Sequence, residues 1–249
     1  MSLRSTNKLR NKKFDEISTK KFYNEIISKK NPVIFDIGAN KGQTIEFFLK
    51  IFKNPKIYAF EPSRDVYKIL EQNYITSKNI ILKNVAIDKK NIKRKIFYYH
   101  TFPSNNTSGL AGFYKINKSS KDHINLNNKS FKKKILSNIN HVNYVEARSV
   151  DSIFDEYKIK MLDILKIDTQ GNEENVLFGA KKSLRKIRFL KLEVMLFDYY
   201  EKNYSLYDIE KILRRHGFKL FNILEINNNP KTLKTDWVEL LYYNSNINY

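Results

Sequence analysis

The stretch "VIFDIGANKGQT", residues 33–44, indicates the fold more clearly than any other part of the chain. Four of its first five residues are apolar, which is typical of a strand buried on both faces. Two of the seven glycines, Gly38 and Gly42, follow at once, and apolar residues recur at helical spacing from Gln43 onward. The stretch therefore predicts a strand, a tight turn and a helix, which together open a parallel α/β sheet.

Two further strands and a helix follow in the same order. "KIYAFEP", residues 56–62, predicts a second strand that is stopped by a proline, and Ser63 is the expected N-cap of the next helix. "NIILKNVAI", residues 79–87, predicts a third strand. Strands that alternate with helices predict a mostly parallel sheet with right-handed crossovers.

The second half of the chain supplies the remaining strands. "MLDILKID" and "IRFLKLEVMLF" predict two more buried strands, with a helix between them. A helix is expected from Leu206 to His216, with Gly217 as its C-terminal stop. "FKLFNILEI" and "DWVELLYY" then predict a final antiparallel hairpin.

One domain accounts for most of the chain. We expect residues 31–249 to form it, preceded by a basic, helical extension at residues 1–30. Residues 102–142 are rich in Asn, Ser and Lys and poor in apolar residues, which predicts an insertion or lid. "VNYVEARSVD" follows as a strand, with Asp151 as the expected cap of a short helix. We find no internal repeat.

The composition is that of a globular protein, with 41% hydrophobic and 29% charged residues. The chain has no cysteine, which excludes disulfides, thiolate metal ligands and thiol nucleophiles. No apolar run reaches the roughly 18 residues that a membrane span needs, and no apolar segment of a secretory signal follows the basic start. We therefore expect a cytoplasmic protein without a membrane span.

The formal net charge of +20 suggests a polyanionic partner such as nucleic acid. Of the 46 basic residues, however, only nine are arginines, the residue type that binds phosphate with two parallel hydrogen bonds. The lysines are spread along the chain among many Asn, Ile and Tyr residues. We interpret this mixture as a bias toward A/T-rich codons and do not expect nucleic acid as the partner.

The turn after the first strand indicates the type of ligand. Its pattern is D-x-G-x-x-x-G, which differs from the G-x-G-x-x-G of dinucleotide-binding proteins and from the G-K-[ST] of phosphate-binding loops. Gly38 allows a sharp bend and a close approach of a ligand, and Gly42 relieves crowding where the helix begins. Asp36 is a carboxylate at the strand end. It favours a ligand with a positive group, such as a sulfonium that also carries an α-amino group.

The next strand ends supply further binding residues. Glu61 follows the second strand, where an acid accepts hydrogen bonds from both hydroxyls of a ribose. Asn84 and the backbone at Ala86 follow the third strand and are expected at the adenine edge.

These motifs resemble those of the FkbM family of S-adenosylmethionine-dependent methyltransferases. The resemblance rests on "FDIGANKGQT", "YAFEPS", "NVAID", "SVDSI" and above all "LDILKIDTQGNEENVLFGA". It implies a class I methyltransferase fold, Rossmann-like, with a seven-stranded sheet and helices on both faces. It also implies S-adenosylmethionine as cofactor, S-adenosylhomocysteine as product, and methyl transfer to oxygen, often on a sugar. The positions that fall on the family's cofactor-binding motifs are Asp36, Gly38, Asn40, Gly42 and Glu61.

Two acids are the candidate catalytic residues. Asp168 falls on the acid of the family's K-I-D signature, and Glu193 lies in the following strand. If the two strands are neighbours, one carboxyl has a raised pKa and suits a general base. The alternative, that the two acids hold Mg²⁺ or another divalent cation, is open but not favoured.

The acceptor site is expected around Gln170, which replaces the glutamate common in the family, and around aromatic residues after the fifth strand, namely Phe197, Tyr199 and Tyr200. The main hypothesis is a methyltransferase acting on a carbohydrate hydroxyl, either of a nucleotide-linked sugar or of a surface polysaccharide unit. The alternatives are an RNA methyltransferase and a non-catalytic cofactor-binding module.

Overall fold

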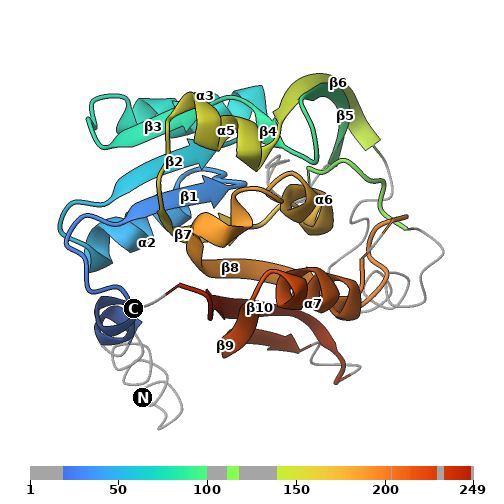
Figure 1. Cartoon of the computed structure of the whole chain (residues 1–249). Helices are drawn as coiled ribbons and strands as arrows, with labels where there is room; N and C mark the ends of the chain where they lie inside the picture. Colours follow the sequence, from blue (N-terminus) through green and yellow to red (C-terminus); the bar gives the residue numbers. More distant parts are fainter. Residues whose placement is uncertain (1–18, 100–110, 118–138, 203, 229–232, 248–249) are drawn as a thin grey trace, which may run out of the picture.

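A seven-stranded sheet forms the centre of the protein (Figure 1). The computed structural model describes residues 19–99, 111–117, 139–202, 204–228 and 233–247. The strand order is β3-β2-β1-β7-β8-β10-β9. In chain order these strands are β1 (Val33–Ile37), β2 (Lys56–Phe60), β3 (Ile80–Lys83), β7 (Leu162–Ile167), β8 (Ile187–Met195), β9 (Phe218–Asn228) and β10 (Thr235–Asn244).

The strand directions confirm the expected sheet. β1 pairs in parallel with β2 and β7, β2 with β3, and β7 with β8. β10 alone is antiparallel to its two neighbours, β8 and β9, so the last two strands form the expected hairpin. Because the order reverses between β1 and β7, the carboxyl ends of these strands are the expected place for a ligand.

Helices cover both faces of the sheet, as predicted. One face packs against α2 (Gln43–Ile51), α3 (Arg64–Tyr74) and the helical residues 19–26. The other face packs against α5 (Val150–Glu156), α6 (Glu173–Phe178), the short 3₁₀ helix η2 (Leu184–Lys186) and α7 (Leu206–Arg215). α7 ends at His216, and Gly217 follows with a φ of 85°, which confirms the expected stop.

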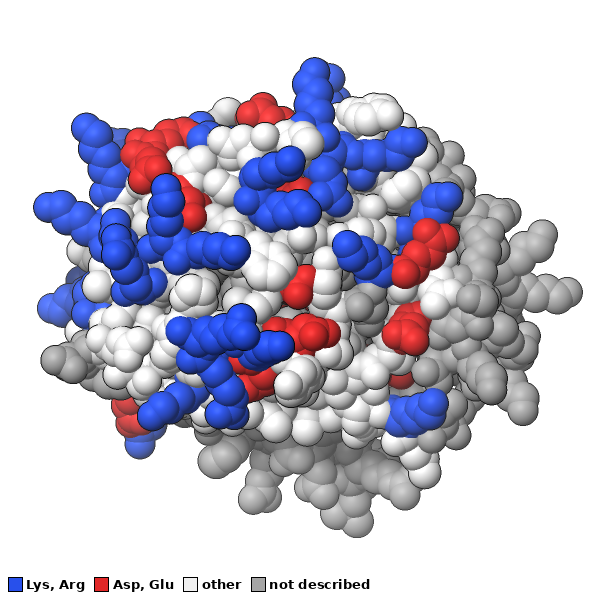
Figure 2. Space-filling view, turned by 45° about the vertical axis from the view of Figure 1, so that its right-hand side comes forward, with Lys and Arg blue, Asp and Glu red and all other residues white. Residues whose placement is uncertain are grey.

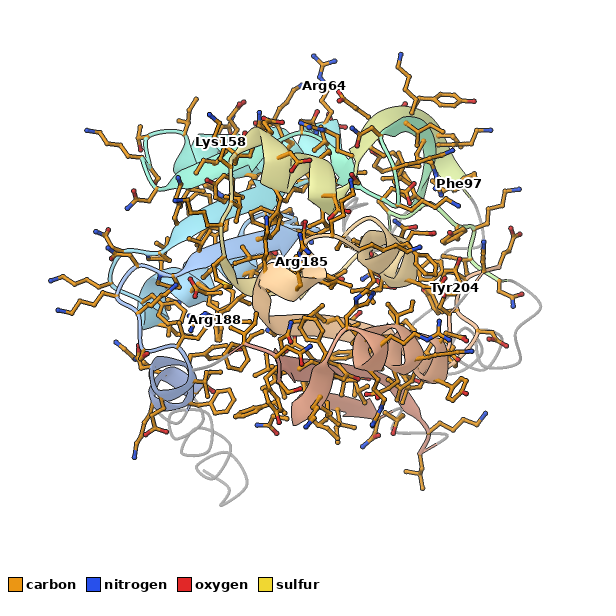
Figure 3. The ribbon with its side chains drawn as sticks, in the orientation of Figure 1. Arg64, Phe97, Lys158, Arg185, Arg188 and Tyr204 are labelled. Atoms are coloured by element: carbon orange, nitrogen blue, oxygen red, sulfur yellow. The ribbon has the colours of Figure 1, made fainter. Side chains whose placement is uncertain are left out.

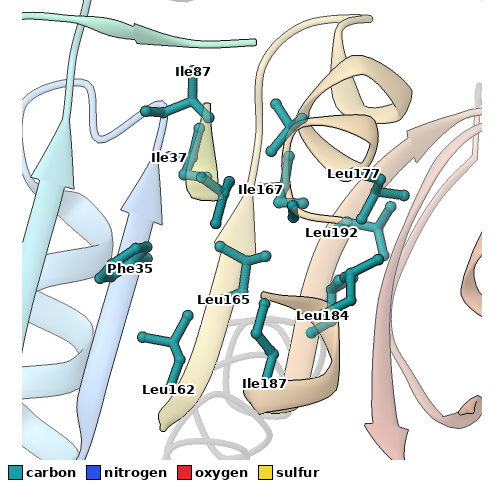
Figure 4. Close-up of a cluster of buried hydrophobic side chains, with 14 of the residues drawn as sticks. Phe35, Ile37, Ile87, Leu162, Leu165, Ile167, Leu177, Leu184, Ile187 and Leu192 are labelled. Atoms are coloured by element: carbon teal, nitrogen blue, oxygen red, sulfur yellow. The ribbon is translucent and has the colours of Figure 1, made fainter. Parts of the chain in front are cut away.

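The central strands are buried on both faces. In β1, Phe35 and Ile37 belong to the core layer under α5 and α6, while Ile34 belongs to the layer under α2. Figure 4 shows the first of these layers, to which β7 contributes Leu162, Leu165 and Ile167. This two-sided burial explains why the strands appear in the sequence as nearly continuous apolar runs.

A second, three-stranded sheet has the order β4-β6-β5, with β4 (Ala86–Ile87), β5 (Ile92–Tyr99) and β6 (Ile139–Arg148). The predicted single strand at residues 79–87 was therefore wrong, because β3 and β4 belong to different sheets. The break lies at Asn84, whose side-chain amide donates to the backbone oxygens of Glu61 at 2.8 Å and Pro62 at 3.2 Å. The Asn84 side chain thus makes hydrogen bonds to the β2 end that the backbone of a continuous strand would otherwise make.

Most of the predicted insertion at residues 102–142 lies outside the described residues. Its described part, residues 111–117, connects the two sheets. Gly112 exchanges backbone hydrogen bonds with Phe97 of β5, at 2.9 and 3.1 Å. Farther along, the backbone of Asn117 donates to Tyr199, after β8, at 2.8 Å. The segment therefore crosses from the small sheet to the loop that follows β8.

The cap of α5 and the N-terminal extension differ from what the sequence predicted. Ser149, not Asp151, caps α5, and the Asp151 carboxylate instead accepts from the backbone and hydroxyl of Ser183. At the N-terminus, Tyr23 and Ile27 are buried in the core beside α2, so this part of the expected extension packs on the sheet. Residues 1–18 lie outside the described residues. No helix among the described residues is long and apolar enough to cross a membrane.

We expect Asp163→Ala to lower the free energy of unfolding by about 2–3 kcal/mol, because it removes a fully buried acceptor of the Val33 N–H and the anionic partner of the partly exposed Lys29 and Arg188. Asp163 is fully buried and accepts from Lys29 Nζ and the Val33 backbone, each at 2.9 Å, while Arg188 Nε lies 3.6 Å away. Arg188 lies at the end of the molecule opposite Phe97 and Tyr204 (Figure 3). Urea unfolding measures the effect. The exposed Asp155→Ala should change stability by less than about 0.5 kcal/mol, and an equal loss in both variants would contradict the assignment.

Candidate active site

A cavity opens at the carboxyl ends of β1, β2, β4 and β7. It encloses about 760 Å³, including its open mouth. Its apolar walls include Ile37, Phe60, Ile87, Ile96 and Phe113, and its polar walls include Asn40, Glu61, Asp168, Thr169, Gln170 and Asn172. Residues 111–113 close one side, so the described part of the insertion belongs to the cavity wall.

Glu61 is the buried acid of this cavity. Its side chain accepts from the backbone N–H of Asn40 at 2.9 Å and of Ser63 at 2.8 Å. Only 7% of the residue is exposed. Burial raises the pKa of Glu61 to about 7, although the two backbone donors act in the opposite direction. The two backbone donors use one acceptor position on each oxygen of the carboxylate. The remaining positions can accept hydrogen bonds from ribose hydroxyls.

The loop after β1 leaves room for a ligand beside Glu61. Gly38 has a φ of 80°, and a Cβ atom there would lie 1.9 Å from the backbone oxygen of Asp168. Only glycine fits, because the loops after β1 and β7 touch backbone to backbone. Asn40 has a φ of 49°, and its side-chain oxygen is buried without a hydrogen-bond partner among the described residues. That oxygen is free to accept a hydrogen bond from a bound ligand.

A buried lysine connects the strands below the cavity. Lys166 Nζ lies 3.3 Å from each of Asp36 Oδ1, Asp168 Oδ2 and the backbone oxygen of Gly38. Burial acts to lower the pKa of Lys166, but the carboxylates of Asp168 and Asp36 outweigh it and raise the pKa, so the ammonium stays charged. Burial raises the pKa of Asp36, and the Lys166 charge opposes that shift.

The loop after β7 is fixed by side-chain hydrogen bonds. Gln170 has a φ of 54°; its Nε2 donates to Asp168 Oδ1 at 2.9 Å, and its Oε1 accepts from the Tyr200 hydroxyl at 2.8 Å. Glu173 Oε1 accepts from the backbones of Thr169 and Gly171 at 3.0 and 3.1 Å. Glu173 is therefore structural, as expected from its place in the first turn of α6. Asp168 does not cap that helix and stays available at the cavity.

Glu193 has a different environment from that of Asp168. β7 and β8 are neighbours, as the two-acid hypothesis requires. Glu193 makes no hydrogen bond or ion pair with another described residue. Burial raises its pKa to about 8, and the negative charges of Asp168, Glu173 and Glu239 act in the same direction. The two acids are therefore electrostatically distinct: Asp168 is paired with a lysine, and Glu193 is not.

Several predicted residues lie near the cavity without lining it. Asp36 is fully buried and faces Lys166, so that lysine takes the place of the positive ligand group expected there. Gly42 instead accommodates the ring of Tyr74, to which a Cβ would come within 2.5 Å. The Asn84 amide is used on the backbone at the β3–β4 break, whereas Ala86 does line the cavity.

The predicted acceptor residues divide in the same way. Gln170 lines the cavity. Tyr200 is 1% exposed and cannot stack on a sugar ring, so its contribution is the hydrogen bond to Gln170. Phe197 and Tyr199 are partly exposed and pack edge to face, with ring centroids 5.5 Å apart, beside the cavity rather than in its wall.

Sequence reasoning missed Lys166 and the wall formed by residues 111–113. Lys166 had a signal, because a lysine inside the apolar run "LDILKI" requires a buried anionic partner. The wall had none, because it lies in a polar stretch whose position depends on backbone pairing with Phe97 and Tyr199.

The described residues fit S-adenosylmethionine. The unpartnered oxygen of Asn40 and the carboxyl of Glu61 offer acceptors, Gly38 leaves the backbone bare, and apolar side chains line the region toward Ala86. No group of three or more metal-binding side chains occurs among the described residues.

Comparison with known proteins agrees with this fit. A family model described as the methyltransferase FkbM domain matches residues 36–220. The 2-O-methyltransferase NoeI of Sinorhizobium fredii is 28% identical over 192 residues, which cover 74% of this chain and 73% of the relative. Among solved structures, an rRNA methylase from Streptococcus thermophilus has a TM-score of 0.44 at 11% identity and covers 91% of this chain and 94% of its own. M. capricolum TrmK, solved with S-adenosylhomocysteine, has a TM-score of 0.45 at 11% identity and covers 86% and 63%.

We expect Lys166→Met to destabilise the protein by about 3 kcal/mol, because the fully buried Asp36 then loses its cation and the partly exposed Asp168 loses one of its two side-chain partners. The double variant Lys166→Met with Asp36→Asn should recover part of the loss, since it removes one of the two stranded charges. Denaturant unfolding measures both, with the exposed Lys160→Met as control. A fully stable single variant would exclude the pairing.

A second expectation concerns pH. Because the pKa of Glu61 is raised from its usual 4.5 to about 7 on folding, the carboxyl stabilises the fold below about pH 4.5, and this contribution is lost as the pH rises through 7. The free energy of unfolding of the wild type should therefore fall by roughly 2 kcal/mol relative to Glu61→Gln between pH 5 and 8. Thermal or urea unfolding across this range measures the difference. The exposed Glu25→Gln should show none, and parallel curves for wild type and Glu61→Gln would refute the shift.

Proposed function

We propose that this chain, which belongs to the FkbM family of S-adenosylmethionine-dependent methyltransferases, transfers the methyl group to a hydroxyl oxygen of a carbohydrate. The observation that carries the proposal is the pair of unlike acids at the carboxyl ends of β7 and β8. Asp168 is held by Lys166 and Gln170, while the Glu193 side chain has no ion-pair partner among the described residues and has a raised pKa. A carboxyl with a raised pKa beside a second carboxylate that is held by a lysine is suited to divided roles in proton transfer.

The cofactor supplies an electrophilic methyl group on a sulfonium, which an acceptor oxygen attacks in line. Glu61 and Asn40 bind the ribose and orient it, while the bare backbone at Gly38 lets the cofactor lie close to β1. Gln170 and Asp168, at the same cavity, position the acceptor hydroxyl. Asp168 remains in one orientation because Lys166 and Gln170 each donate to a different oxygen of it.

Glu193 accepts the proton of the acceptor hydroxyl. A carboxyl with a pKa of about 8 is a stronger base than an ordinary glutamate, so it accepts a proton more readily once it is ionised. An alcohol needs such a base because its oxygen must lose the proton as the new bond forms. Glu193 does not line the cavity itself. It acts beside Asp168, at the side where the acceptor enters.

A carbohydrate acceptor agrees with the polar character of this side. An amide such as that of Gln170 and a carboxylate such as that of Asp168 both bind hydroxyl groups, and the partly exposed rings of Phe197 and Tyr199 lie nearby. The name of the relative, a 2-O-methyltransferase, supports an oxygen acceptor. The acceptor is a hydroxyl of a nucleotide-linked sugar or of a surface polysaccharide unit.

The distribution of surface charge makes RNA a weaker candidate for the acceptor. On the face shown in Figure 2, lysines and arginines are interrupted by acidic and uncharged side chains instead of forming one continuous basic stripe. A backbone-tracking site needs such a stripe. A non-catalytic role is also disfavoured, because Glu61, Asp168 and Glu193 are all present with the environments described above.

The acceptor is tested with labelled S-adenosylmethionine and a panel of nucleotide-linked sugars and oligosaccharides, read out by mass spectrometry. Comparison of cell-surface glycans with and without the gene should reveal one methyl group fewer per unit in the deletion strain. Methylated RNA in place of methylated glycan would overturn the carbohydrate proposal. Binding of S-adenosylhomocysteine, measured by calorimetry, separates a missing acceptor from an inactive protein.

The role of Glu193 predicts a pH profile. The turnover number kcat should rise with pH to a plateau above about 8, because Glu193 accepts a proton only after it has lost its own. Glu193→Gln should lower kcat by about 10²–10⁴-fold and flatten the profile, with the affinity for S-adenosylhomocysteine unchanged within about threefold. The exposed Glu201→Gln is the matched control. If Glu193→Gln turned over at the wild-type rate, the general base would have to be another residue.

A further inference from the structure

The strand β9 forms one edge of the large sheet, opposite β3 (Figure 1). With 11 residues it is much longer than the four-residue β3. Apart from Phe218 and the half-buried Leu224, its residues up to Asn228 are exposed. An edge strand presents unpaired backbone N–H and C=O groups, which a second chain can extend.

This edge carries an apolar surface. Leu220, Phe221, Ile223 and Ile226 are exposed by 44%, 42%, 47% and 54%. Four half-exposed side chains of this size amount to roughly 300–400 Å² of apolar surface, which on a monomer often marks an interaction site. Edge strands that stay unpaired usually carry several charges or a proline, whereas β9 has no proline and only two charged residues, Lys219 and Glu225.

The positions of these two charges make the strand complementary to itself. Lys219 and Glu225 are equally distant from Asn222, three residues to either side. In an antiparallel pair of two β9 strands centred on Asn222, each Lys219 lies opposite the Glu225 of the other copy. Any other register separates both ion pairs.

We propose that two copies of this chain associate antiparallel along β9, with Asn222 at the two-fold axis and two Lys219–Glu225 ion pairs between the copies. Neither Lys219 nor Glu225 forms an ion pair with another residue in the part of the chain that the structure describes. A two-fold arrangement uses the same surface on both copies, as in most homodimers. Lys219 and Glu225 lie opposite Tyr243 and Glu239 of β10, which share one face of the sheet, so both charges are on the face where a two-fold pair brings them together.

The dimer is weak. The pairing of β9 with β10 changes register between Glu239 and Leu240 and again between Leu241 and Tyr242. Such bulges bend a strand and shorten any ladder it can form with another chain. Two copies of this apolar patch bury roughly 700 Å² of apolar surface, at the lower end for a specific interface, so a dissociation constant in the micromolar range is expected.

Sedimentation equilibrium of the full chain between about 5 and 200 μM tests the proposal, and a monomer–dimer equilibrium is expected. Ile223→Glu should shift the protein to monomer, because it places a charge in the exposed apolar surface of β9. Lys219→Glu and Glu225→Lys should each weaken association at least about tenfold, since each creates two like-charge pairs. The double variant Lys219→Glu with Glu225→Lys should restore it to within about threefold, because the ion pairs are reformed with reversed sign.

Lys78→Glu, an equal charge change at the exposed end near β3, is the matched control and should leave the dissociation constant unchanged. Circular dichroism and thermal unfolding establish that each variant is folded. Wild-type protein that is monomeric at 200 μM, or a dimer that Ile223→Glu does not weaken, overturns the proposal. If each single charge variant weakens association and the double variant does not restore it, the proposed register of the two β9 strands is wrong.

Discussion

The contact on which the site depends is the ammonium of Lys166 between two carboxylates and a carbonyl. Asp36 comes from β1 and Asp168 follows β7, and both lie 3.3 Å from the same Nζ atom, as does the carbonyl oxygen of Gly38. Asp36 is fully buried and Asp168 is 34% exposed, and two carboxylates held around one point in this way are unfavourable without a cation. The lysine therefore allows the two strand ends to meet, and the switch point of the sheet is built around it.

The close contact of the two strand ends determines the rest of the site. Because the loops after β1 and β7 touch backbone to backbone, Gly38 tolerates no side chain, and this leaves the cavity open beside Glu61. From Asp168 a chain of hydrogen bonds continues through Gln170 to Tyr200. Residues 111–117 attach to the same loop through Tyr199. Hydrogen bonds thus connect the loops after β7 and β8 with residues 111–117 beside the cavity.

The sequence predicted most features that depend on neighbours along the chain, although the strand break at Asn84 and the cap at Ser149 were missed. Buried strands, the turn at Gly38 and the acid at Glu61 follow from local pattern, and the structure has each of them at the expected strand end. Contacts across strands were harder to predict. Asp36 was expected to face a ligand, but register pairs it with Lys166, and Tyr200 was expected to stack on a sugar, but burial behind the β7 loop prevents this. Both errors arise because the identity of a residue's neighbour is set by the fold.

The state of Glu193 depends on its immediate neighbours rather than on the sheet edge. Glu193, Glu239 and Glu225 lie directly opposite one another across β8, β10 and β9. Lys191 neutralises the middle one, with its Nζ 2.8 Å from Glu239. Adjacent strands lie about 4.8 Å apart, so Glu225 is roughly 10 Å from Glu193, about one Debye length at physiological ionic strength. A lysine from a second copy therefore acts on Glu225 and hardly on Glu193, whose pKa is raised first by burial and then by the charges of Asp168, Glu173 and Glu239. The proposed association along β9 and the proposed proton transfer at Glu193 are consequently independent, although the row of Glu225, Glu239 and Glu193 connects the two places.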